Sequence, residues 1–229
     1  MRILIAVAHA DDETLGCFSL LSDPAHEVHI LHATDSAPRD LKYALRSGFA
    51  SRKDYLAARR DETLSLLSLA GIPLSRYHCL GFADQEAPVY WRQIRAFAAA
   101  FTADRIYTHA YEGGHPDHDA LAYALAGLPN LWEFPLYNAL ADEFVPHTFL
   151  DGGGQAVVLD DRQRRLKRSW LACFASQQRV ISMFPVVHEL FRPMQAYDFS
   201  RPPHAGELYY ERRQLGWTWP SWREATLVK

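Results

Sequence analysis

Short apolar runs alternate with longer amphipathic stretches along most of the chain. Residues 2–8 form a run that is apolar after Arg2 and rich in Ile, Val and Ala, which is typical of a strand buried on both faces. Residues 52–70 show apolar positions at helical spacing and end at Gly71, with Pro73 two residues later. Repeated strand–helix alternation of this kind predicts an open, mostly parallel sheet with helices on both faces.

The remaining elements are predicted from the same patterns. Strands are expected at 27–33, 77–80, 105–109, 131–137 and 155–159, helices at 12–21, 89–101, 116–126 and 160–175, and a loop at 34–40. Residues 177–229 hold many aromatic residues and several prolines, so we expect an irregular segment packed on a rigid core, 1–176. The chain is interpreted as one α/β domain, 1–229, with a Rossmann-like three-layer fold.

Composition narrows the class of protein further. The 229 residues carry a net charge of −3, which gives no general attraction to nucleic acid. No apolar stretch approaches the roughly 20 residues needed to span a membrane, and the apolar N-terminus lacks a cleavage segment. The three cysteines are scattered, which favours a reducing, cytoplasmic location. The aromatic C-terminal segment fits either the core or the interface of a homo-oligomer.

Two segments rich in His and Asp each follow a predicted strand. They are A-H-A-D-D-E at Ala8–Glu13 and H-P-D-H at His115–His118. Because the carboxyl ends of parallel strands meet at one edge of a sheet, we expect both segments to share one site. Catalytic zinc commonly has three ligands from His and carboxylates, so His9, Asp12 and His118 are the candidate metal ligands.

The other polar residues of these segments suggest catalytic roles. Asp11, beside a ligand, is free to deprotonate a water as general base. His115 could stabilise an oxyanion or protonate a leaving amine, and Asp117 could orient it. Taken singly, each segment is explained as well by acidic residues at a helix start. Their occurrence together at two strand ends favours a metal site.

The two segments resemble the signatures of the PIG-L/LmbE family of zinc-dependent N-deacetylases, A-H-P-D-D-E and G-H-P-D-H. The resemblance covers about the first 130 residues. It implies a zinc ion, or iron or cobalt, and the roles given above for Asp11, His115 and Asp117. It also implies two substrate-binding residues: Arg59, which begins an R-x-x-E segment, and Asp84, which follows Leu-Gly. On physical grounds alone these two would be a solvated helix charge and a loop residue.

Two positions depart from the family pattern. Ala10 stands where the first motif usually has proline, which predicts a less rigid turn. Gly113 stands where some members of the mycothiol pathway have tyrosine, and Tyr111 is not equivalent in position. Asp35 and Arg39, after the second strand, either reach the substrate or are solvated.

Four further polar residues are interpreted more simply. His109 is expected to be an interior histidine and Glu112 a solvated residue. The C-terminal segment holds two histidines, His188 and His204, and either of them could close the pocket or lie outside it.

The function expected from the residues and the resemblance together is hydrolysis of an N-acetyl group on an amino sugar or related glycoconjugate. Two alternatives stay open: metal-dependent hydrolysis of another bond, such as a phosphoester, and a non-catalytic sugar-binding protein. A nucleotide-binding oxidoreductase is disfavoured, because the first turn carries acids where a pyrophosphate requires glycines.

Overall fold

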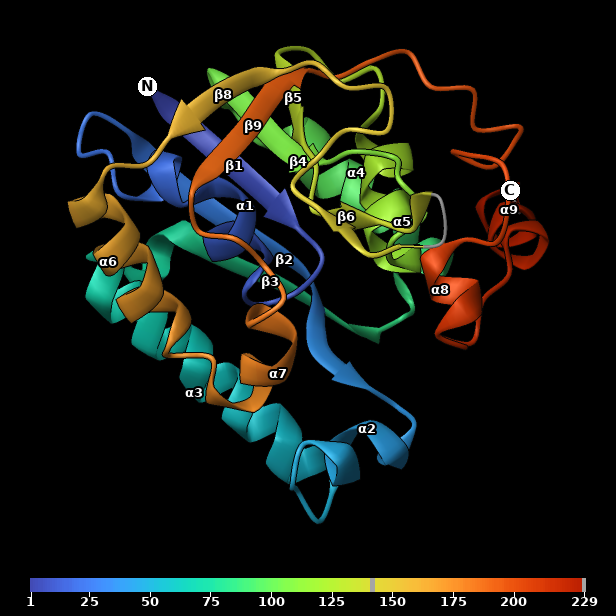
Figure 1. The fold of residues 1–229 in the computed structure, drawn as a ribbon, viewed down its shortest axis with the longest axis horizontal. Coiled ribbons are helices and arrows are strands. Elements are labelled where there is room, and N and C mark those ends of the chain that lie inside the picture. The colour runs from blue at the N-terminus through green and yellow to red at the C-terminus, as the bar shows by residue number, and fades with distance from the viewer. Residues whose placement is uncertain (141–142, 228–229) are drawn as a thin grey trace.

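Strand β1 (Arg2–Val7) runs through the middle of a seven-stranded sheet (Figure 1). Its side chains point alternately to the two faces, as strand geometry requires, and both faces are buried. One core contains Ile3, Ile5 and Val7, and the other contains Leu4, Ala6 and Ala8. The computed structural model describes residues 1–140 and 143–227.

The strand order places the two motifs side by side. The sheet has the order β3-β2-β1-β4-β5-β9-β8. Its other strands are β2 (Glu27–Pro38), β3 (Tyr77–Asp84), β4 (Arg105–His109), β5 (Leu131–Phe134), β8 (Gln155–Val158) and β9 (His188–Pro193). Strands β1 to β5 are parallel to one another, whereas β9 is antiparallel to both β5 and β8. From β1 the chain continues to β2 and β3 on one side, and it then crosses to β4 on the other side of β1. The carboxyl ends of β1 and β4 therefore lie where the strand order reverses, which is where α/β sheets bind ligands.

Helices cover both faces of the sheet (Figure 1). The core with Ile3 is covered by α1 (Asp12–Leu21), α3 (Arg52–Ala70) and α6 (Asp161–Leu171), and the other core by α4 (Ala87–Ala100) and α5 (Pro116–Leu125). The expected three-layer fold with a mostly parallel sheet is confirmed.

The loop expected at 34–40 is wrong over most of its length. Strand β2 continues to Pro38 and pairs with β3, which itself extends to Asp84. The pairing of β2 with β3 shifts register on either side of Thr34, so the strand continues through the residues that were expected to form turns. Within this stretch Ser36 has a positive φ of 59°. The extension carries Ser36 and Asp84 to the same sheet edge as the motifs. A short helix that the sequence did not predict, α2 (Leu41–Arg46), follows.

The C-terminal segment is more regular than expected. It contains α7 (Gln178–Ile181), β9, α8 (Tyr209–Arg212) and α9 (Trp219–Leu227), and a 3-10 turn at Ala175–Gln177 leads into it. A second 3-10 turn, Leu74–Arg76, lies far from this segment in the sequence, directly before β3. Because β9 lies between β5 and β8, this segment completes the sheet instead of resting on a finished core. Helix α9 is fixed through Trp222, whose indole N–H donates to the Pro116 carbonyl at 3.0 Å.

A two-stranded sheet, β6 (Tyr137–Asn138) and β7 (Val145–Pro146), lies apart from the main one. Within the described residues, no helix combines the length and apolar character needed to cross a membrane. The three cysteines are free; Cys17 is buried, but Cys79 is exposed.

Candidate metal centre

The turn after β1 is held in an unusual conformation. Asp11 precedes α1 with a φ of 105°, which costs a non-glycine residue about 1–3 kcal/mol. Two buried hydrogen bonds oppose that cost: the Ala10 N–H donates to Ser36 Oγ at 2.8 Å, and the Asp11 N–H donates to Glu13 Oε2 at 3.1 Å. A proline in place of Ala10 could not donate, so alanine allows Ser36 to fix the turn.

Asp12 is the point on which the histidines converge. Its Oδ2 accepts the His9 backbone N–H at 2.8 Å and lies 3.3 Å from His9 Nδ1. The same oxygen is 3.3 Å from His118 Nε2 and 3.4 Å from His109 Nε2. Burial alone would raise the pKa of Asp12, but His118 and His109 hold it well below its ordinary value. The carboxylate is therefore ionised and ready to bind a cation.

His118 and His109 are stacked, with ring centres 3.9 Å apart and planes 3° from parallel. Burial, with His109 next in effect, lowers the pKa of His118 to about 3, so the ring is neutral at pH 7. Its Nε2 is buried and has no hydrogen-bond partner among the described residues. A neutral imidazole with an unsatisfied nitrogen beside an ionised carboxylate fits a divalent metal.

Three overlapping groups of side chains have ligand atoms close enough to hold a metal ion. In each group these atoms lie within 4.8 Å of one another; the groups are His9–His115–His118, His9–Asp84–His115–Asp117 and Asp12–His109–His118. No single group holds all three expected ligands: His118 shares one group with His9 and another with Asp12, and His9 Nδ1 lies 3.3 Å from Asp12 Oδ2. His109, expected to be an ordinary interior histidine, belongs to the same cluster.

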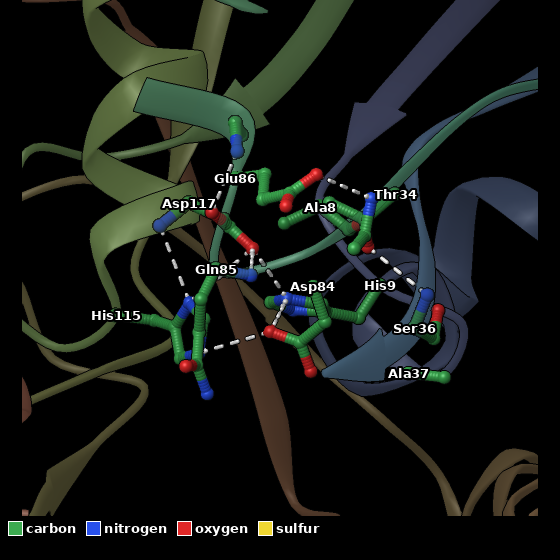
Figure 2. A network of polar contacts seen from close by, with 12 residues as sticks. Ala8, His9, Thr34, Ser36, Ala37, Asp84, Gln85, Glu86, His115 and Asp117 are labelled. Atoms are coloured by element: carbon green, nitrogen blue, oxygen red, sulfur yellow. Dashed lines mark hydrogen bonds and ion pairs between the residues drawn. The ribbon is translucent and has the colours of Figure 1, made fainter. Parts of the chain in front are cut away.

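Asp84 and Asp117 both contact His9 (Figure 2). Asp117 Oδ2 lies 3.1 Å from His9 Nε2, and Asp84 Oδ1 lies 3.2 Å from the same nitrogen. Asp117 also accepts backbone N–H groups from Gln85 at 2.7 Å and Ala87 at 3.0 Å. Its carboxylate is 3.9 Å from His115 Nδ1, so it orients His9 more directly than the histidine two residues before it.

His115 is the residue before α5, and its Nδ1 accepts the Asp117 backbone N–H at 3.2 Å. The neutral ring must then carry its hydrogen on Nε2, which lies 3.5 Å from Asp84 Oδ1. Burial, followed by the neighbouring His9, lowers the pKa of His115 to about 3. In this arrangement the ring is neutral and can donate a hydrogen bond from Nε2.

The Asp11 carboxylate forms an ion pair with a buried arginine, Arg59. Arg59 Nη2 lies 3.3 Å from Asp11 Oδ2 and also donates to the Ala10 carbonyl, while Nη1 donates to Glu62 Oε2 at 2.9 Å. The side chain of Arg59 is only 3% exposed. Burial raises the pKa of Asp11 to about 8, although Arg59 opposes that rise. Such a carboxyl can both take up and release a proton near neutral pH.

A cavity of about 170 Å³ opens onto these groups. Its polar lining comprises five motif residues and five others: His9, Asp11, Asp12, His115, His118, Ser36, Arg59, Asp84, Gln85 and Gln177. Its less polar walls comprise Leu15, Tyr43, Leu136, Tyr137, Val180, Phe184 and Leu215. Most of these wall residues come from the C-terminal half, where the sequence offered no motif, so sequence reasoning missed them.

The weaker candidates lie outside the cavity lining. Asp35 pairs with Arg52 at 2.5 Å, and Arg39 pairs with Glu86. Glu112, expected to be solvated, is buried; its Oε2 accepts the Leu136 N–H at 2.9 Å.

The two C-terminal histidines and Tyr111 are also absent from the cavity lining. His188 lies in β9, and His204 is in the tail with Nδ1 at 2.8 Å from the Ala205 carbonyl. The Tyr111 hydroxyl donates to the Arg201 carbonyl at 3.0 Å.

Comparison with known proteins agrees with this geometry. The profile of the PIG-L family, described as GlcNAc-PI de-N-acetylase, matches residues 4–127, more than half of the chain. The chain belongs to this family. The resemblance seen in the two motifs is thereby confirmed. No curated protein matches the chain.

Solved structures of other members and relatives share the fold. The zinc-inhibited form of teicoplanin deacetylase Orf2 has a TM-score of 0.62 at 17% identity, covering 80% of this chain and 86% of that one. The A40926 pseudoaglycone deacetylase Dbv21 has a TM-score of 0.60 at 21% identity, covering 79% and 84%. GalB, the 4-carboxy-2-hydroxymuconate hydratase from Pseudomonas putida, has 0.53 at 12%, covering 86% and 98%. The fold thus serves more than one reaction.

Proposed function

We propose that this protein is a divalent-metal-dependent deacetylase that removes the acetyl group from an N-acetylated amino sugar or glycoconjugate. The observation that carries the proposal is a carboxylate, Asp11, facing a small cavity beside a His/Asp cluster in a family of de-N-acetylases. We assign His9, Asp12 and His118 as the ligands of the metal, and zinc as the metal they would hold.

The residues around the ligands divide the reaction between them. A divalent metal would polarise the acetyl carbonyl and increase the acidity of water in the site. Asp11 accepts the proton from the attacking water and, with its raised pKa, delivers it to the leaving nitrogen. Arg59 keeps Asp11 oriented, and the neutral His115 donates its Nε2 hydrogen at the same cavity. Acetate and a free amine are the products.

Substrate recognition is assigned to two residues implied by the family resemblance. Asp84 lines the cavity, where a carboxylate oxygen can accept a sugar hydroxyl. Arg59 also lines it, but its guanidinium is engaged with Asp11 and Glu62, so we propose that it acts on substrate mainly through Asp11. Scattered free cysteines favour a cytoplasmic location, and we propose a small N-acetylated sugar as partner.

Metal removal tests the proposal directly. Purified protein should contain about one metal ion per chain and release acetate from at least one member of a panel of N-acetyl sugars. Chelation should reduce that activity in proportion to the metal removed, and one equivalent of zinc, iron or cobalt should restore it. Metal analysis and acetate detection on the same samples provide the measurement. Full activity in metal-free protein would refute the mechanism.

Loss of one ligand should separate metal binding from folding. His118→Ala should weaken zinc affinity by at least about 10-fold, since even the partners of metal ligands typically contribute that much. His26→Ala provides the matched control, because His26 lies near the N-terminus, away from the cluster. Zinc affinity is measured by competition with a chromophoric chelator. Equal affinities for the two variants would exclude His118 as a ligand.

A second candidate, phosphoester hydrolysis, is favoured by one observation. Two of the ligand groups, His9–Asp84–His115–Asp117 and Asp12–His109–His118, share no residue, and two-metal sites often serve phosphate chemistry. A stoichiometry near two metals per chain, with phosphate release from a generic phosphoester, would select it. Metal binding without turnover of any panel member would instead select a sugar-binding protein.

A further inference from the structure

Tyr137 stands at the metal cluster, although it lies outside the segment that matches the family. It begins β6, beyond residue 127, and lines the cavity together with Asp11 and Asp12. Its ring meets that of His118 edge-on, with ring centres 5.4 Å apart and planes at 71°. A tyrosine in this position presents its phenol to the site where the reaction is proposed to occur.

The ring is fixed by its surroundings. Three aromatic rings lie around it at centre distances of 5.3 to 5.9 Å, those of Phe144, Phe184 and Tyr209. Its backbone is pressed against the second motif: a Cβ on Gly114 would lie 2.1 Å from the Tyr137 carbonyl oxygen. Only glycine permits this approach, so the motif and the tyrosine are held in one arrangement.

The Tyr137 hydroxyl has no hydrogen-bond partner among the described residues, and the half-buried side chain lines the cavity. A tyrosine hydroxyl ordinarily has a pKa of about 10. The hydroxyl therefore keeps its hydrogen throughout the physiological range. The hydroxyl can therefore donate a hydrogen bond to a molecule bound in the cavity.

We infer that Tyr137 is a catalytic residue, whose hydroxyl donates a hydrogen bond to the carbonyl oxygen of the scissile amide as negative charge develops on it. This inference rests on the proposed function. The hydrogen stays on Tyr137, and the only bonds made and broken are those of amide hydrolysis. A fixed donor aimed at a developing oxyanion stabilises the transition state more than the ground state.

Two other donors near the cavity already have acceptors. The Arg59 guanidinium is occupied by Asp11 and Glu62, whereas His115 Nε2 has only Asp84 Oδ1 nearby, at 3.5 Å. The Tyr111 hydroxyl donates elsewhere, to a backbone carbonyl of the C-terminal segment. The Tyr137 hydroxyl, which has no such acceptor, is therefore available to a substrate oxygen.

Tyr137→Phe tests the inference by removing one oxygen atom. We expect kcat to fall by about 10²–10³, the usual cost of losing one oxyanion donor, with KM changed less than threefold and zinc content unchanged. Tyr209→Phe is the matched control, because Tyr209 belongs to the same aromatic cluster but not to the cavity lining. It should stay within twofold of wild type. A Tyr137→Phe kcat within threefold of wild type would overturn the inference.

A trifluoroacetyl substrate separates catalysis from packing. Fluorine stabilises an oxyanion without help from the protein, so Tyr137→Phe should lose at least about 10-fold less activity on the N-trifluoroacetyl sugar than on the N-acetyl sugar. A merely structural defect would reduce both rates equally and would lower the melting temperature as well.

Acetate gives a readout that needs no turnover. Ligand-observed NMR on the zinc-loaded proteins should show acetate binding at least about 10-fold more weakly to Tyr137→Phe than to wild type, since hydrogen bonds to charged groups are strong. Equal affinities would overturn the inference even if a substrate is known. If wild type hydrolyses no panel member, the proposed function fails, while the acetate comparison still decides whether Tyr137 is a donor in this cavity.

Discussion

Asp11→Asn should leave a folded, metal-loaded protein that has lost nearly all turnover. Asparagine has the same shape and can still accept the hydrogen bond from Arg59, but it cannot take a proton from water. General acid–base catalysis typically contributes 10²–10⁴, and Asp11 acts twice, so we expect kcat to fall by at least about 10³. KM should change only a few-fold, because the substitution leaves the cavity lining intact.

Three measurements on one preparation decide the outcome for Asp11→Asn: steady-state acetate release, zinc content and thermal unfolding. Asp61→Asn is the control, since Asp61 is exposed on the helix that carries Arg59. It should match wild type in all three. Retention of more than a tenth of kcat by Asp11→Asn would show that another group deprotonates the water. Loss of zinc would instead show that Asp11 is a ligand.

Lys167→Met should destabilise the fold by about 3–5 kcal/mol, the usual result of leaving one member of a buried ion pair alone. Lys167 and Glu189 are both fully buried and lie 2.6 Å apart. Glu189 also accepts the backbone N–H groups of Phe18 and Ser19, each at 2.9 Å, and Lys167 donates to the Leu15 carbonyl at 2.7 Å.

This pair replaces helix hydrogen bonds where α1 is irregular. Cys17 has non-helical angles, φ −133° and ψ 21°, so the helix cannot satisfy the neighbouring backbone groups itself. Lys167→Met would leave the Glu189 carboxylate without its counter-charge in an apolar core. Since α1 begins with Asp12, strain there should also reach the candidate metal site.

Denaturant unfolding of Lys167→Met measures the loss, which thermal melts should show as about 2–4 °C per kcal/mol in a domain of this size. Lys53→Met is the control, because Lys53 is an exposed lysine on α3. Adding Glu189→Gln to Lys167→Met should recover at least about 1 kcal/mol by removing the unpaired charge. A loss below about 1 kcal/mol for the single variant would show that the pair contributes little.

Local pattern was sufficient to predict the layers and the motifs. The apolar run of β1 and the helical spacing of 52–70 specify burial directly, and both elements lie where expected. His9, Asp12 and His118 are brought together because β1 and β4 are neighbours. That adjacency is common in parallel α/β sheets, so the predicted fold supported the prediction that the two motifs share one site.

Features that depend on tertiary contacts could not be predicted. Lys167 sits in a strongly basic helix that reads as solvated, yet its buried partner comes from β9, a strand the sequence did not suggest. Tyr137 was expected only as the end of a strand, 131–137, but it begins the separate two-residue strand β6, and its close approach to Gly114 brings it to the site. Asp117 was assigned to His115 by proximity in sequence, whereas its carboxylate is nearer His9.

The cavity described above draws its two sides from different parts of the chain. Apart from Tyr137, the groups assigned to bond cleavage come from residues 9–118, within the family segment, while Val180, Phe184 and Leu215 supply walls from beyond it. Selectivity can therefore diverge while the hydrolytic apparatus stays fixed. Exchange of residues 178–227 between members, with Tyr137 retained, would be a way to redirect this chemistry to new amides, and motif similarity alone should group members by reaction and not by substrate.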